Sequence, residues 1–215
     1  MVRALFALLL AAPVAAYANP VPVLPAPVLS FENAAADLQA SVASLRAAQK
    51  KEKAGELGPR INALAWDLER YERGAAQLRR DLRWLQSRVR RYQRPQPGRP
   101  DSDPSLRWDL QRFNRELASL SRDEQWRLND LRFVLAQAVK DETLVPAAQR
   151  LANAARMLKS ETNWLASDAR FASWDFRRAG FTFESMDMDR DSRDAEQNAQ
   201  DLQWDADRLL GKIRG

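Results

Sequence analysis

Residues 61–92 read INALAWDLERYERGAAQLRRDLRWLQSRVRRY, and their apolar side chains recur in alternating steps of three and four residues. A seam of this kind, sustained over four heptads, is the signature of a coiled-coil helix. It therefore predicts one long amphipathic helix over this range. The seam positions are Ile61, Leu64, Leu68, Tyr71, Ala75, Leu78, Leu82, Leu85, Val89 and Tyr92.

Helical spacing continues on both sides of this stretch. An apolar line from Phe31 to Leu45 predicts an earlier helix, which Gly55, Gly58 and Pro59 should end. Later lines predict a third helix over 105–141, a fourth carrying the line 148–176, and a short C-terminal helix carrying the line 199–213. The expected breakers lie near 55–59, 94–104, 143–146 and 180–188.

No stretch alternates apolar and polar residues for long enough to form a strand. The sequence therefore predicts an all-α fold, an antiparallel bundle of four long amphipathic, coiled-coil-like helices plus a short C-terminal helix. Within 105–141 the seam slips between Leu120 and Leu128, where it takes two successive steps of four. Such a stutter locally unwinds a supercoil.

The chain contains an internal repeat. When residues 64–84 are laid on residues 106–126, a shift of 42, 11 of the 21 positions are identical. Several matches lie off the seam, so shared heptad bias does not explain them, and we interpret the two segments as a duplicated helix. The matched residues of the first copy are Leu64, Trp66, Asp67, Leu68, Arg70, Arg73, Ala76, Leu78, Arg80, Asp81 and Trp84.

The N-terminal residues predict export from the cytoplasm. Residues 1–18 combine Arg3, an apolar run and an Ala16-Tyr17-Ala18 cleavage pattern, as a signal peptide does. A Pro-rich leader over 19–30 and a single helical-bundle domain over 31–215 should follow. We expect the product in a bacterial periplasm or outside the cell, with no transmembrane segment after signal cleavage.

The composition excludes many chemistries, because Cys and His are both absent. A thiol nucleophile, a disulfide, a Ser-His-Asp triad and the usual zinc or haem ligands are therefore ruled out. The carboxylates are spread over predicted helix faces rather than paired. We expect no enzyme activity, no catalytic residue, no cofactor and no metal site.

Trp and Arg form the most unusual pattern in the chain. Six of the seven Trp have an Arg four residues away, a spacing that lets both side chains touch on a helix. The simplest interpretation is a second apolar helix face that is buried in the bundle. The alternatives are a protein interface and a face that binds a ligand. The residues proposed for a partner or ligand face are Trp66, Arg70, Trp84, Trp108, Arg112 and Trp126.

Charge is segregated along the chain. Residues 79–99 hold eight Arg and one acid, whereas residues 184–207 hold nine acids and two Arg. The two segments could pack together or be solvated faces, or the basic segment could bind an anionic polymer. The candidate polyanion-binding residues are Arg79, Arg80, Arg83, Arg88, Arg90, Arg91, Arg94 and Arg99.

These patterns favour an exported, non-enzymatic protein that acts in protein–protein interaction or scaffolding through its helix faces. A protein partner or self-association is expected. One alternative is a module that binds an anionic glycan, lipopolysaccharide or nucleic acid. A second alternative, which rests on fold analogy alone, is a periplasmic holdase-type chaperone.

Overall fold

The computed structural model describes residues 28–92 and 104–215. The predicted signal peptide and nearly all of the Pro-rich leader lie outside the described residues. The chain divides into two compact units, residues 1–45 and 46–215. In the first unit the described part is the beginning of a helix, whose side chains at 39–45 are exposed. The second unit holds the bundle.

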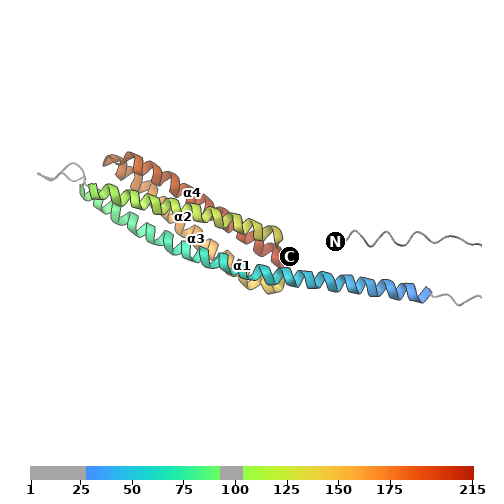
Figure 1. Cartoon of the computed structure of the whole chain (residues 1–215). Helices are drawn as coiled ribbons and strands as arrows, with labels where there is room; N and C mark the ends of the chain where they lie inside the picture. The colour runs from blue at the N-terminus through green and yellow to red at the C-terminus, as the bar shows by residue number, and fades with distance from the viewer. Residues whose placement is uncertain (1–27, 93–103) are drawn as a thin grey trace, which may run out of the picture. The chain divides into compact units, whose positions relative to one another are not determined.

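The described residues form α-helices and no strand, which confirms the predicted all-α class (Figure 1). The elements are α1 (Val28–Tyr92), α2 (Pro104–Gln137), the short 3-10 helix η1 (Glu142–Leu144), α3 (Val145–Arg178) and α4 (Thr182–Arg214). The break expected near 143–146 falls where η1 passes into α3. Of the break expected near 180–188, only Gly180 and Phe181 lie outside a helix, since α4 begins at Thr182. The break expected at 94–104 lies almost wholly outside the described residues.

Helix α1 corrects one expectation, because it continues through Gly55, Gly58 and Pro59 without interruption. A proline inside a helix removes one backbone hydrogen bond and disfavours the helix locally. Here Leu57 and Ile61 are both buried on either side of Pro59, and this packing outweighs the local preference. The first two predicted helices are therefore one.

Two other boundaries differ from expectation. Helix α2 ends at Gln137 rather than near 141. The C-terminal helix α4 begins at Thr182 and has 33 residues. Its buried line extends upstream of Ala199 through Ser185, Met188 and Ala195, so the extra turns pack on the bundle.

The ion pairs show how the four helices neighbour one another. Pairs between α1 and α3 follow the same order along both helices, so these two neighbours run parallel: Glu69–Arg150, Arg79–Asp168 and Arg90–Asp175. Pairs between α2 and α4 do the same: Arg107–Glu184 and Arg132–Asp205. Pairs between α1 and α2 run in opposite order, as do those between α3 and α4: Arg88–Asp109 with Asp67–Arg127, and Arg156–Asp207 with Arg170–Glu196.

The bundle therefore consists of two antiparallel hairpins, α1–α2 and α3–α4, that lie side by side. The turn inside the second hairpin is closed by Gly180, whose φ of 88° lies in the left-handed region. Gly180 donates its N–H to the Arg177 carbonyl and Phe181 donates to the Phe176 carbonyl, at 3.0 and 2.9 Å. This is the Schellman pattern by which helices commonly end.

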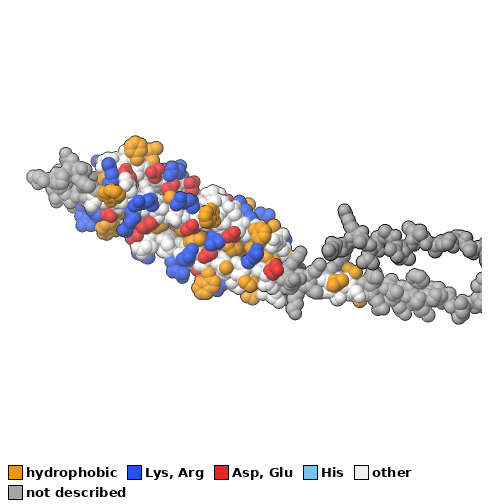
Figure 2. All heavy atoms as spheres, viewed as in Figure 1, with side chains coloured by type: hydrophobic (Ala, Val, Ile, Leu, Met, Phe, Trp, Pro, Cys, Tyr) orange, Lys and Arg blue, Asp and Glu red, His pale blue; other side chains and the backbone are white. Residues whose placement is uncertain are grey.

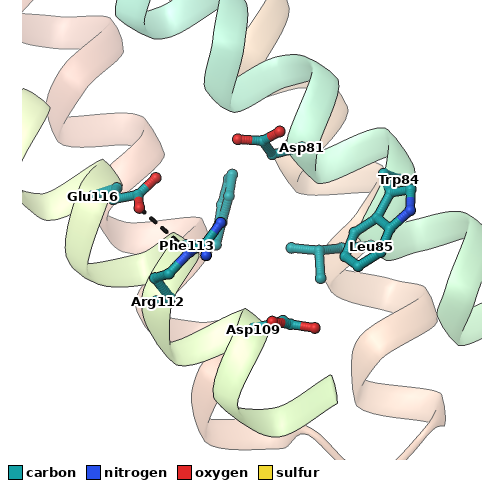
Figure 3. Close-up of a pocket in the computed structure, with 7 residues that line it drawn as sticks. All are labelled: Asp81, Trp84, Leu85, Asp109, Arg112, Phe113 and Glu116. Carbon is teal, nitrogen blue, oxygen red and sulfur yellow. Dashed lines mark ion pairs between the residues drawn. The ribbon is translucent and has the colours of Figure 1, made fainter. Parts of the chain in front are cut away.

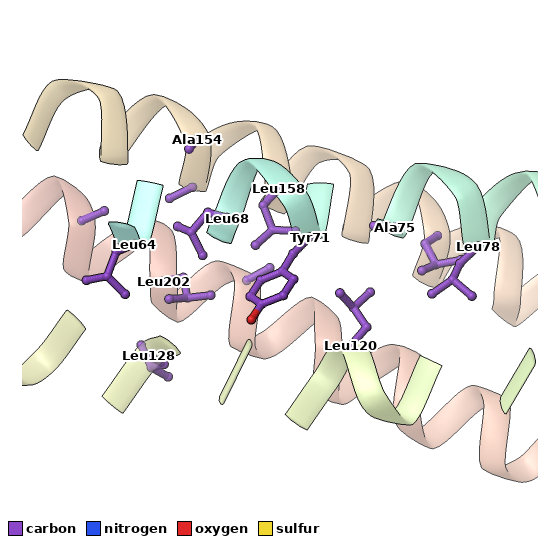
Figure 4. Packing of buried hydrophobic residues seen from close by; sticks show 14 of the residues in the cluster. Leu64, Leu68, Tyr71, Ala75, Leu78, Leu120, Leu128, Ala154, Leu158 and Leu202 are labelled. Atoms are coloured by element: carbon purple, nitrogen blue, oxygen red, sulfur yellow. The ribbon is translucent and has the colours of Figure 1, made fainter. Parts of the chain in front are cut away.

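The core follows the predicted seams. The nine seam residues from Ile61 to Val89 are all buried, and so are the predicted lines of α3 and of α4. Figure 4 shows one part of this core, where Tyr71 of α1 lies among Leu120 and Leu128 of α2, Leu158 of α3 and Leu202 of α4. All four helices thus contribute to a shared core of mainly Leu and Ala.

Candidate interaction surface

The seven Trp are surface residues, so the prediction of a second buried face is wrong. Their exposed fractions run from 51% at Trp84 to 72% at Trp204. The seam residues already fill the core, and the indoles project from the remaining sides of the helices. The full set is Trp66 and Trp84 on α1, Trp108 and Trp126 on α2, Trp164 and Trp174 on α3, and Trp204 on α4.

On the face of the bundle that Figure 2 shows, the exposed hydrophobic side chains do not form one continuous patch. Figure 2 shows hydrophobic side chains standing apart on the visible face of the bundle, with Lys, Arg, Asp and Glu side chains between them. Other large apolar side chains are exposed as well, including Phe133, Phe171 and Phe183. The apolar surface is therefore distributed over several helix faces.

The expected Arg neighbours of Trp are confirmed at two sites and replaced at a third. Arg88 lies over the Trp84 ring at 4.7 Å, and Arg178 lies over the Trp174 ring at 5.2 Å, both from the next turn of the same helix. The Arg over Trp66 is instead Arg150 of α3, at 4.1 Å. Trp164 of α3, for which the sequence predicts no Arg neighbour, lies under Arg79 of α1 at 5.3 Å.

The candidate Arg70 lies elsewhere than predicted, since its guanidinium is 5.3 Å from the Tyr71 ring and 3.8 Å from Asp67. These positions are set by the packing of helices against each other. The spacing along one helix could therefore not give them.

Trp66 belongs to a cluster that joins α1 to α3. The Arg150 guanidinium donates two hydrogen bonds to the Glu69 carboxylate, at 2.9 and 3.0 Å, while it lies over the Trp66 ring. The hydrogen bond from Arg150 holds the pKa of Glu69 below its usual value. A groove of about 440 Å³ beside the cluster is lined by Pro146, Met157 and other side chains of α3, together with Glu69.

A second cleft, of about 360 Å³, lies between α1 and α2 (Figure 3). It brings together two of the predicted site residues, Trp84 and Arg112. Leu85 and Phe113 supply its apolar part, and each of its three carboxylates has a partner on the chain. Asp81 accepts a hydrogen bond from Gln77 at 2.8 Å, Asp109 pairs with Arg88 at 2.5 Å, and Glu116 pairs with Arg112 at 3.5 Å. The carboxylates are therefore already engaged within the chain.

Carboxylates of neighbouring helices neutralise most of the described Arg in the basic segment of α1. Six of its eight Arg are described, and four of these pair with carboxylates of α2 or α3. The pairs are Arg79 with Glu161 and Asp168, Arg83 with Asp168, Arg88 with Asp109, and Arg90 with Asp175. Arg80 donates to Gln77, and Arg91 donates to Ser87. Arg94 and Arg99 lie outside the described residues.

The acidic segment of α4 also has partners on other helices. Glu184, Asp205, Asp207 and Glu196 pair with Arg107, Arg132, Arg156 and Arg170, respectively. The ion pairs that both segments form with other helices in the described residues are therefore made with α2 and α3. The charge of each segment is balanced by side chains on helices that the charge pattern of the sequence did not indicate.

Glu124 of α2 is a residue that the sequence analysis missed. It is fully buried, and neither carboxylate oxygen has a hydrogen-bond partner among the described residues. Two signals could have found it. It occupies the seam position between Leu120 and Leu128 at the stutter, and the internal repeat aligns it with Leu82.

No protein-family model, curated protein or solved structure matches the chain. None of the described helices combines the length and the apolar character that a membrane span requires. In the described ranges no group of three or more acidic side chains is placed to hold a metal ion. The function must therefore be inferred from the chain's own surface.

Proposed function

We propose that this chain is an exported, non-enzymatic interaction protein whose Trp-bearing helix faces bind partner proteins or further copies of the chain. The observation that supports this most is the exposure of all seven Trp by more than half. An exposed indole leaves a large apolar surface in water, and association removes that surface from water. Trp and Arg are also enriched among the residues that dominate binding at protein interfaces.

The distribution of the indoles supports binding through more than one face. Trp66 on α1, Trp126 on α2, Trp174 on α3 and Trp204 on α4 project from four different helices. One flat partner covers one side of a bundle. A protein that bridges several partners, as a scaffold does, can use indoles on all sides.

Some of these indoles are held in place before any partner arrives. Trp66 lies under Arg150, which Glu69 holds with two hydrogen bonds. Side chains that are already ordered lose less conformational entropy on binding. The cluster is therefore better suited to recognition than a mobile surface Trp.

The two alternatives make different demands on the same surface. Binding to an anionic polymer is favoured by the net charge of +5 and by exposed Arg80 on the basic segment. It is disfavoured by the carboxylates that already hold Arg79, Arg83, Arg88 and Arg90. A holdase would use scattered apolar side chains, but it should bind many unrelated unfolded chains.

The test is the molar mass of the full chain by light scattering, at low and at high salt, with Trp emission read on the same samples. We expect an assembly that survives high salt and has blue-shifted emission. Trp66→Ala and Trp126→Ala should lower the mass, because each removes an apolar anchor. Asn62→Ala and Gln125→Ala change exposed neighbours on the same helices and should leave the mass unchanged.

A monomer with red-shifted emission at both salt concentrations would contradict self-association. Binding that disappears as salt rises would favour the anionic polymer. Suppression of aggregation for several unrelated clients would favour the holdase.

A further inference from the structure

Glu124 differs from every other buried carboxylate in the described part of the chain. The three buried aspartates each have an Arg partner: Asp175 with Arg90 at 2.9 Å, Asp191 with Arg190 at 2.9 Å, and Asp205 with Arg132 at 3.0 Å. Glu124 is 0% exposed, and both of its oxygens lack a partner among the described residues. A buried charge without a partner is strongly disfavoured, so this carboxyl is neutral in the packed bundle.

The position of Glu124 does not require a polar side chain. Leu120, Glu124 and Leu128 are spaced by four residues and share the buried face of α2. In the first copy of the internal repeat the same position is Leu82, which is also 0% exposed. The two copies of the repeat thus place a leucine and an acid at the same buried position.

Among the described residues no basic side chain forms an ion pair with Glu124. On α2 itself, Asp123 is a second carboxylate, and Arg127 is turned to Asp67 at 2.9 Å and to Asp130 at 2.6 Å. Figure 4 shows the apolar core on both sides of Glu124, where Leu120 and Leu128 of α2 lie in the same part of the bundle as Tyr71, Leu158 and Leu202. Burial raises the pKa of Glu124 well above its usual value, and the Asp123 carboxylate raises it further.

We propose that Glu124 makes the packing of the middle layer of the bundle depend on a proton. The layer stays packed while the Glu124 carboxyl is protonated, and it loosens when the carboxyl releases its proton to water. This layer is the part of the core around Leu120 and Leu128, which flank Glu124 on α2. Figure 4 shows that part of the core with Tyr71 from the first hairpin and with Leu158 and Leu202 from the second. Loosening it weakens the contact between the hairpins and gives water access to the core. This device is independent of which partner the outer Trp bind.

The direction of the pH dependence follows from linkage. The pKa of Glu124 is higher in the folded chain than in the unfolded chain, so the folded state keeps a proton that the unfolded state has already released. The stability contributed by this group is complete below the unfolded pKa. Above that pH, the folding equilibrium constant falls by up to about tenfold per pH unit, until the carboxyl ionises in the folded chain as well.

The absence of Cys from the natural chain allows a clean local test. Leu202→Cys places one thiol in the same layer on α4, and its rate of modification reports water access. The rate is measured from mildly acidic to mildly alkaline pH, with Glu124 present and in the Glu124→Gln background. The ratio of the two rates cancels the ionisation of the thiol itself. We expect this ratio to rise with pH, by up to about tenfold per unit.

Two control variants test whether the effect belongs to Glu124 and to this part of the core. Glu116→Gln, at an exposed position two turns earlier on α2, should leave the modification rate unchanged. Leu209→Cys, in a buried position further along α4, should show a smaller rise than Leu202→Cys. A ratio that stays constant with pH, or that rises equally at both thiols, would overturn the assignment of proton-dependent packing to this layer.

A second measurement does not depend on the thiol. Urea unfolding of the natural chain, followed by circular dichroism, should lose stability as pH rises, whereas Glu124→Leu, which copies Leu82, should not show this loss. Parallel pH profiles for the two proteins would overturn the proposal.

Discussion

The contacts of Arg150 show how a single residue connects surface, fold and charge. Its guanidinium lies 4.1 Å from the Trp66 ring centre and donates two hydrogen bonds to Glu69. Arg150 comes from α3, and the other two residues come from α1. The cluster therefore exists only when the two hairpins are packed together. Its partners are exposed enough that its effect on stability is modest.

The cluster predicts acid sensitivity. The pKa of Glu69 is lowered in the folded chain by the hydrogen bond from Arg150. Its contribution to stability is therefore present above the unfolded pKa and is lost as pH falls through the folded pKa. Glu69→Gln should flatten the acid limb of a plot of urea midpoint against pH. Glu142→Gln, at an exposed residue of η1, serves as the control. Identical acid limbs for Glu69→Gln and the natural chain would contradict this role.

At the scale of elements, the seams of the predicted helices were sufficient to give the core. The regular spacing from Ile61 to Val89 predicts burial correctly because a helix has only one side facing its neighbours. The same spacing could not show that α1 continues through Pro59, since that depends on packing around Leu57 and Ile61. It also could not distinguish an outward indole from a buried one, because an Arg four residues away is compatible with both.

Replacing either of two glycines with alanine should change the free energy of unfolding, in opposite directions. Gly74 lies inside α1 with no atom within 4 Å of an added Cβ, so Gly74→Ala should raise the free energy of unfolding by about 0.5–1 kcal/mol. Gly180 has equally open surroundings but a φ of 88°. Gly180→Ala should lower the free energy of unfolding by about 1–2 kcal/mol, because a side chain disfavours this conformation. Urea unfolding measures both, and a change of the same sign in both variants would contradict the assigned backbone geometry.

At the scale of the whole molecule, the sequence could not give the order of the helices around the bundle. The ion pairs place α1 beside α3 and α2 beside α4, both in parallel. Each helix alone carries charges that could match several neighbours, and only the three-dimensional arrangement selects among them. The same arrangement explains why the described parts of the oppositely charged segments 79–99 and 184–207 form their interhelical ion pairs with α2 and α3.

This neutralisation predicts how the whole protein behaves on an anionic polymer. Arg79, Arg83, Arg88 and Arg90 would have to leave their carboxylates to bind a sulfated glycan or DNA, and that exchange gains little. Retention on an immobilised sulfated glycan should therefore end near physiological ionic strength, about 0.15 M, where charges more than about 8 Å apart are screened. Arg80→Gln should weaken the retention at low salt more than Arg79→Gln does, because Arg80 has Gln77 rather than an acid as its partner. Retention that persists well above that salt concentration, or that depends equally on both residues, would favour the polymer-binding alternative over an interaction protein that works through its indoles.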